Sequence, residues 1–145
     1  MCKADLPNII KIEQGSQVMP WTRDSFEESL NKEHYCRVIE KGSEDKSLVA
    51  FHIVCAVADE LHILTLAVRT GLQGNGLGHV LMHDIIEYAE SKKVKKIFLE
   101  VRASNRIAQN LYQKWQFKQI AIRKAYYRTS SNKREDALVY VRLTD

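Results

Sequence analysis

The segment from Leu66 to Gly78 joins an apolar run to a glycine-rich turn, and it is the clearest candidate for a binding site in this chain. Gly74, Gly76 and Gly78 remove side chains from alternate positions of the turn, so its backbone N–H groups can point at a ligand. A helical pattern follows directly, and the first N–H groups of a helix, together with its dipole, attract anions. The segment therefore predicts a site for phosphate or pyrophosphate. The alternative is a tight strand-to-helix turn without a ligand.

Two well-known phosphate-binding loops do not fit this segment. A Walker A loop requires lysine and then serine or threonine after its last glycine, whereas His79 follows Gly78 here. The dinucleotide fingerprint requires the spacing G-x-G-x-x-G and an acidic residue about 20 positions later, and residues 74–78 lack that spacing. The predicted anion site therefore belongs to another class.

Glu100 lies within an apolar run, 96–101, that is typical of a buried strand. Burying a carboxylate costs free energy, so its presence there needs a reason. One interpretation is structural, an ion pair in the sheet with Arg102 or Arg123. The other is functional, a general base. The residues alone favour the ion pair and leave both interpretations open.

Asn105 and Tyr112 stand seven residues apart within a helical pattern over 104–115. Two helical turns separate them, so their side chains fall on one face. Asparagine at the start of a helix is usually its N-cap, which is the structural interpretation of Asn105. The structural interpretation of Tyr112 is a core aromatic residue with a hydrogen-bonded hydroxyl.

The histidines give weaker signals. His79 and His83 stand four residues apart on a helical pattern, but the sequence offers no evident third ligand, and we expect no metal site. His52 and His62 alternate with apolar residues, so we expect them on strand faces.

The elements that must position these residues follow from the apolar periodicity. Their order, α-α-β-β-β-α-β-α-β-β, predicts a single-domain α/β fold with a mixed, twisted sheet flanked by helices. Strands 61–68 and 96–101 should be parallel and close together, because one right-handed helical crossover joins them in a central β-α-β unit. Helices are expected from Asp5, as N-cap, to about residue 16, from the cap Thr22 through Leu30, over 76–92 and over 104–115; strands at 35–40, 48–57, 61–68, 96–101, 117–126 and 136–143; and a polar loop from Arg128 to Glu135.

Bulk composition bounds the class of protein. The 145 residues suit one domain, 1–145, and the 45% hydrophobic and 28% charged content is typical of a globular protein. A net charge of +4 without an arginine-rich tract argues against direct nucleic-acid binding. No apolar run reaches the roughly 20 residues of a membrane span, so we expect no membrane partner.

Residues 1–5 lack the apolar stretch of a signal peptide, which argues against export. Three cysteines without a CxxC pair favour a reducing cytosol.

Several motifs together resemble a known family. Gln73-x-x-Gly76-x-Gly78 matches the Q-x-x-G-x-G/A signature of the GNAT acyl-CoA N-acetyltransferases. From about Asp5 to Leu143 the chain is similar, within that superfamily, to the bacterial ribosomal-protein-alanine N-acetyltransferases. The motifs that carry this similarity stand in order and at family spacing: Pro20-Trp21, Leu66-Ala67-Val68, Leu99-Glu100-Val101-Arg102-Ala103-Ser104-Asn105, Ala108-x-x-Leu111-Tyr112, Phe117, Tyr126-Tyr127 and Arg134-Glu135-Asp136-Ala137.

The resemblance implies a GNAT fold that binds acetyl-CoA as cosubstrate between two splayed parallel strands. It implies acetyl transfer to the N-terminal α-amine of a protein, most specifically the N-terminal alanine of a small-subunit ribosomal protein, in the cytoplasm. Glu100 would be the proton acceptor and Tyr112 the proton donor. The residues so implied for the cofactor are Leu66, Ala67 and Val68 for the acetyl-pantetheine arm, Gln73, Gly74, Asn75, Gly76, Leu77 and Gly78 for the pyrophosphate, and Asn105 for a further CoA contact; Tyr126 and Tyr127 would border the peptide groove.

The chain also departs from the family pattern. Relatives carry Asp-Pro where Arg69-Thr70 stands, and a first strand ahead of Asp5 that we expect to be absent or very short. Relatives end the helix before Phe117 with glycine, and Gln116 at that position predicts an altered helix exit. Two other functions stay open: a GNAT enzyme that acetylates a lysine side chain or a small amine, and an acyl-CoA-binding module without catalysis. The sequence does not indicate the oligomeric state.

Overall fold

The computed structural model of the protein describes residues 1–44 and 46–144, so residues 45 and 145 of the predicted domain lie outside the described residues. The order of helices and strands is the predicted one. Strand ends differ from the prediction by a few residues. The loop predicted from Arg128 to Glu135 is shorter in the structure, because Arg128 at the end of β5 pairs with Arg134 at the start of β6. The elements are the 3-10 turn η1 (Lys3–Asp5), the helices α1 (Leu6–Ser16), α2 (Arg23–Asn31), α3 (Leu77–Ser91) and α4 (Arg106–Lys114), and the strands β1 (Tyr35–Lys41), β2 (Ser47–Val57), β3 (Glu60–Val68), β4 (Lys96–Arg102), β5 (Lys118–Arg128) and β6 (Arg134–Leu143).

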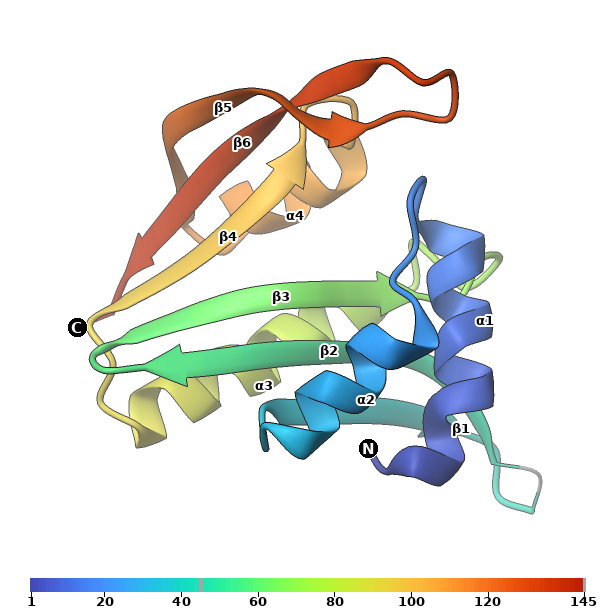
Figure 1. The fold of residues 1–145 in the computed structure, drawn as a ribbon. Helices are drawn as coiled ribbons and strands as arrows, with labels where there is room; N and C mark the ends of the chain where they lie inside the picture. Colours follow the sequence, from blue (N-terminus) through green and yellow to red (C-terminus); the bar gives the residue numbers. More distant parts are fainter. Residues whose placement is uncertain (45, 145) are drawn as a thin grey trace.

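The six strands form one mixed sheet in the order β1-β2-β3-β4-β6-β5. Neighbouring strands are antiparallel except β3 and β4, which are parallel and joined through α3, as predicted. Their pairing covers only residues 60–63 and 96–99. Beyond these residues the two strands diverge toward their carboxyl ends, which leaves a V-shaped split in the middle of the sheet (Figure 1).

Helices cover both faces of the sheet and bury separate apolar clusters. On one face, Leu6 and Ile9 of α1 and Phe26 of α2 pack with Phe51 of β2. On the other face, α3 and α4 pack with β3, β4 and β6 around residues such as Ile85. In α1, Leu6 and Ile9 stand three residues apart, so they share the side of the helix that packs against β2. No helix in the described part of the chain has both the length and the apolar character needed to cross a membrane.

All three predicted N-cap residues stand at the starts of their helices. The Thr22 hydroxyl accepts a hydrogen bond from the Ser25 N–H at 3.3 Å at the start of α2. The Asn105 side-chain oxygen accepts one from the Ala108 N–H at 3.2 Å at the start of α4. Asp5 is the N-cap residue of α1, but its carboxylate accepts from the Cys2 N–H at 2.7 Å and so closes the η1 turn ahead of the helix.

The predicted alteration at the end of α4 is also wrong. The Gln116 N–H donates to the Gln113 carbonyl and the Phe117 N–H to the Tyr112 carbonyl, both at 3.0 Å. These two bonds are the usual Schellman pattern, with a left-handed residue after the helix. Gln116 takes the left-handed conformation itself, with φ of 66°. The exit geometry is thus kept, and glutamine bears the steric strain that glycine avoids.

Candidate active site

A cavity of about 1070 Å³ lies at the split between β3 and β4. Its walls are β3 beyond the split, the glycine-rich loop, the end of β4, α4, the end of α1 with the loop after it, and the β5 segment 126–128. A β-bulge marks the start of the split on β3: Ile63 pairs with Val54 and Thr65 with Ile53, so Leu64 is the extra residue. Beyond the split, no strand among the described residues pairs with the edge of β3 that faces β4, and the backbone polar groups of this edge are open to an extended ligand.

The glycine-rich loop takes backbone conformations that favour glycine. Gly71, Gly74 and Gly76 have φ of 91°, 80° and 82°, and Gly76 is the residue that precedes α3. Gly78 serves another purpose, because a Cβ atom there would lie 3.1 Å from a methyl group of Leu111. The three positive φ values shape the turn at the start of α3, and the missing side chain at Gly78 lets α3 approach α4 beside the cavity.

The residues expected to hold the cofactor divide into two groups. Asn75 and Leu77 lie away from the cavity lining: the Asn75 amide donates to the Leu72 carbonyl at 3.0 Å, and the Leu77 side chain is buried against Leu81. The loop therefore presents its backbone and its glycines to the cavity rather than these two side chains. The residues that do line the cavity are Leu66, Ala67, Val68, Gln73, Gly74, Gly76, Gly78 and Asn105.

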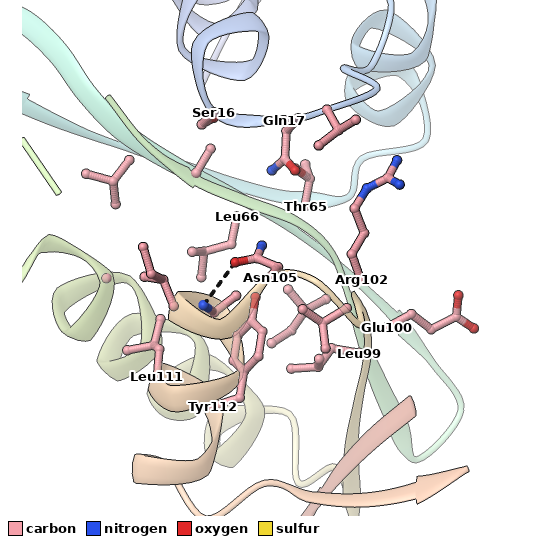
Figure 2. Close-up of a pocket in the computed structure, with 18 of the residues that line it drawn as sticks. Ser16, Gln17, Thr65, Leu66, Leu99, Glu100, Arg102, Asn105, Leu111 and Tyr112 are labelled. Atoms are coloured by element: carbon pink, nitrogen blue, oxygen red, sulfur yellow. Dashed lines mark hydrogen bonds between the residues drawn. The ribbon is translucent and has the colours of Figure 1, made fainter. Parts of the chain in front are cut away.

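Glu100 lies on β4 just beyond the last residue that pairs with β3. Its carboxylate is 2.7 Å from the Arg123 guanidinium, so the predicted ion pair is confirmed with Arg123 as partner. Arg102, the other predicted partner, binds Glu135 at 3.0 Å instead. Along β4, Glu100 alternates with buried Leu99, so it points away from the face that α4 covers, and Figure 2 shows it directed away from Tyr112. Its use as a general base stays a prediction.

Tyr112 and Asn105 lie on one side of α4, as their spacing predicts, and both line the cavity (Figure 2). The Tyr112 ring is buried against Phe117, with ring centroids 5.9 Å apart. Burial raises the pKa of Tyr112 far above its ordinary value, so the hydroxyl keeps its proton across the physiological range. The capping bond uses the side-chain oxygen of Asn105, which leaves the NH2 group of the same amide directed into the cavity.

A second bulge, on β5, follows Arg123, the residue that pairs with Glu100. Register is lost between Arg123 and Tyr127, where three residues of β5 stand opposite the single residue Asp136 of β6. Ala125 in the middle has φ of 51°, and its N–H donates to the Asp136 carboxylate at 3.0 Å. Asp136 thus fixes a conformation that the chain would otherwise avoid.

The bulge also places Tyr126 and Tyr127 at the rim of the cavity. The Arg123 guanidinium lies 4.0 Å from the centroid of the Tyr126 ring, and that of Arg102 lies 4.5 Å from the Tyr127 ring. Burial, together with the charge of Glu100, raises the pKa of Tyr127 to about 12. The two tyrosines form an aromatic rim backed by the Arg102 and Arg123 guanidinium groups.

The sequence interpretation missed the wall made by the end of α1 and residues 17–22. Glu13 is fully buried there, and Val18 and Met19 are half exposed along the cavity. The signal was present, because Glu13 follows Ile9 by four residues and so shares the apolar face of α1. What the sequence lacked was the identity of the elements packed on that face.

The histidines pair with neighbouring side chains, and His79 also lines the cavity. His79 accepts a hydrogen bond from the Trp115 indole N–H at 2.9 Å, and His83 lies 3.7 Å from Glu87. No three histidine, cysteine, aspartate or glutamate side chains gather as metal ligands within the described residues. His52 is buried, 2.7 Å from Asp84, and burial lowers the pKa of this histidine.

A parallel strand pair that splits over a glycine-rich turn and a helix N-terminus defines the fold class of the GNAT acyltransferases. Comparison with known proteins agrees, because residues 6–117 match the acetyltransferase (GNAT) family. The chain belongs to this family, and the expected GNAT fold and acetyltransferase class are confirmed.

Relatives with assigned acceptors lie close in sequence and structure. The chain is 36% identical over 135 residues to the [ribosomal protein bS18]-alanine N-acetyltransferase of Escherichia coli (strain K12), covering 93% of this chain and 88% of that protein. It is 33% identical to the enzyme of the same name from Haemophilus ducreyi, covering 93% and 91%. The crystal structure of the ribosomal-protein-S18-alanine N-acetyltransferase from Escherichia coli has a TM-score of 0.86 and 33% identity, covering 97% of this chain and 88% of that one.

Proposed function

We propose that this enzyme transfers the acetyl group of acetyl-CoA to the N-terminal α-amine of a protein, and that its acceptor is the N-terminal alanine of ribosomal protein bS18. The observation that carries the proposal is the split itself, which joins the glycine-rich loop at one end to the Glu100 and tyrosine rim at the other. The names of the relatives from Escherichia coli and Haemophilus ducreyi support the acceptor.

Acetyl-CoA fits the cavity in a defined direction. The backbone N–H groups at the start of α3, with Gln73 and Gly74 beside them, favour the pyrophosphate. The unpaired edge of β3 over 66–68 offers N–H and C=O groups to the amides of the pantetheine arm, as a strand partner would. The NH2 group of Asn105 points into the cavity, where it can donate to the same arm. This direction brings the thioester to the mouth of the split.

The chemistry then requires three proton transfers. The α-amine, with a pKa of about 7.7–8.0, must lose a proton before it attacks, and Glu100 accepts that proton directly or through one water. Attack on the thioester carbonyl forms the C–N bond, collapse of the adduct breaks the C–S bond, and Tyr112 donates its proton to the departing sulfur. The nitrogen of the new amide releases its second proton, which restores the Tyr112 hydroxyl through solvent. The two groups lie on opposite sides of β4, so a thioester held in the split lies between them.

The acceptor enters along the apolar and aromatic rim. Tyr126 and Tyr127 form one side of this rim, and Val18 and Met19 form the other. The relatives that match most of this chain are named for acetylating an N-terminal alanine, so we favour an α-amine over a lysine side chain or a small amine.

The test is acetyl transfer from acetyl-CoA to three short peptides. One begins with Ala-Arg, one has the same sequence with a blocked amine, and one carries only an internal lysine. We expect transfer to the free-alanine peptide alone. Transfer to the lysine peptide would assign another acceptor, and binding of acetyl-CoA without any transfer would assign a non-catalytic acyl-CoA-binding module.

The proposal also covers the whole chain and its location. We infer that residues 1–145 act as one catalytic domain, since the cavity draws residues from α1 through β5. A cytoplasmic location follows from the proposed acceptor, because ribosomal proteins are synthesised there.

A further inference from the structure

The Glu13 carboxyl has no part in the chemistry proposed above, yet it stands in the wall of the same cavity. It belongs to the last turns of α1, and none of its surface is exposed. The Thr65 hydroxyl donates to its two oxygens at 3.3 Å and 3.5 Å. A fully buried carboxyl whose hydrogen-bond donor is a neutral hydroxyl is costly to keep, and glutamine would fill the same space.

The surroundings of Glu13 are neutral. Residues 17–22, which follow α1, contain no ionisable side chain. On β2, His52 binds Asp84 of α3 on the opposite face of the sheet. On α2, Arg23 and Glu27 pair with each other at the surface, 3.1 Å apart, and on β3, Glu60 and His62 do the same at the far end of the strand. Burial accordingly raises the pKa of Glu13 to about 7, while Thr65, the Trp21 backbone and the Gln17 side chain favour its ionised form.

These partners connect two walls of the cavity. Thr65 follows the Leu64 bulge, where β3 leaves β4. Gln17 and Trp21 belong to the loop 17–22, which carries the exposed Val18 and Met19. In Figure 1 this loop rises beside the open end of the split toward the β5–β6 hairpin, and in Figure 2 Gln17 lies next to Thr65 on the wall across from Tyr112. Glu13 therefore contacts both the loop 17–22 and the strand β3.

We propose that Glu13 is a positioning residue for the acceptor, which holds loop 17–22 against β3 and thereby shapes the acceptor end of the cavity. This inference rests on the proposed function, because it takes the acceptor to be a peptide that enters between this loop and the tyrosine rim. The same turn of α1 is tied to the glycine-rich loop by the Thr70 hydroxyl, which donates to the Gly15 carbonyl at 2.8 Å. Loss of Glu13 should thus affect the acceptor while this second tie keeps the cofactor wall in place.

Steady-state kinetics with the free-alanine peptide test the inference. Glu13→Leu should raise the KM for the peptide about tenfold, as loss of a buried hydrogen bond does, with the KM for acetyl-CoA unchanged. Glu13→Gln keeps the acceptor oxygen and should restore the peptide KM. Thr65→Val removes the donor at nearly constant shape and should raise the peptide KM as well. Glu87→Leu, on the exposed side of α3, is the matched control. Equal changes in both KM values, or none, would overturn the inference.

A second measurement needs neither acceptor nor turnover. In a Trp115→Phe background, Trp21 is the single tryptophan and reports on loop 17–22. Its fluorescence should titrate with a midpoint near the Glu13 pKa of about 7, and Glu13→Gln should abolish this transition. A transition that persists in Glu13→Gln would overturn the inference even if the enzyme acetylates the peptide. If the transition behaves as expected but no peptide is acetylated, the proposed function fails while the tie between Glu13 and the loop stands.

Discussion

At the scale of single residues, Glu100 has two interpretations, a structural ion pair and a general base, and its pairing with Arg123 is compatible with both. The ion pair, at 2.7 Å, offsets the cost of placing a carboxylate in the sheet. It also leaves the Glu100 carboxylate at the cavity wall. A structural partner and a catalytic role are therefore compatible, and substitution is what separates them.

We expect Glu100→Gln and Tyr112→Phe each to lower kcat by about 10²–10⁴-fold, the usual contribution of general acid–base catalysis. The KM for acetyl-CoA should stay near the wild-type value, because neither substitution alters the glycine-rich loop. Steady-state kinetics at saturating acetyl-CoA measure this, with a binding assay for CoA as the control. Unchanged kcat with normal CoA binding would contradict both assignments.

Glu13 gives a second prediction at this scale, on stability rather than rate. The pKa of Glu13 is about 7 in the folded protein against 4.5 for an ordinary glutamate, so between these values the folded state binds the extra proton. Stability is therefore lost as pH rises from 4.5 through 7. Glu13→Gln, which never ionises, should be more stable than wild type at high pH by up to about 3 kcal/mol, and should lose this advantage near about pH 4 to 5. Urea unfolding of both proteins across this range measures the difference. A difference independent of pH would contradict it.

At the scale of elements, the strongest periodic segments were predicted closely and the irregular ones were not. The apolar repeats of residues 77–91 and the buried run at 96–101 depend on local pattern, which the sequence carries. The bulge around Ala125 depends on Asp136 in the next strand, so the pattern of β5 alone did not indicate it. The choice between Arg102 and Arg123 as the partner of Glu100 depends on Glu135 of the next strand, which binds Arg102. The ion pair was therefore predictable only as two alternatives, and the spacing of Glu13 on α1 indicated its apolar face but not the elements packed against it.

The end of α4 supplies a prediction for an element. Gln116 holds a left-handed conformation that costs a residue with a Cβ about 1–2 kcal/mol, while both Schellman hydrogen bonds are intact. Gln116→Gly should therefore raise the free energy of unfolding, by up to about 1 kcal/mol once the greater freedom of glycine in the unfolded chain is deducted. Urea unfolding measures the change, and Gln116→Ala is the control that should bring no gain. A destabilised glycine variant would show that the side chain of Gln116 has a role of its own.

At the scale of the whole molecule, the sheet consists of two parts joined by a short seam. β1, β2 and β3 form one part and β4, β6 and β5 the other, and the parallel pairing between them covers only residues 60–63 and 96–99. The cavity occupies the rest of the boundary, with Leu66 on one side and Asn105 on the other. A ligand that fills this space contacts both parts at once and replaces backbone partners that the split removes.

Acetyl-CoA should consequently stabilise the whole fold rather than one loop. A ligand at 100 times its Kd adds about 2.7 kcal/mol to the free energy of unfolding, which a thermal shift detects. Amide hydrogen exchange should slow on both sides of the split, over 64–68 and over 104–112, because the pantetheine arm takes the place of a strand between them. Gly76→Val, which strains a position with φ of 82° at the start of α3, should weaken both effects together. Protection confined to the glycine-rich loop would mean that the ligand binds through its phosphates alone and that the split serves another purpose.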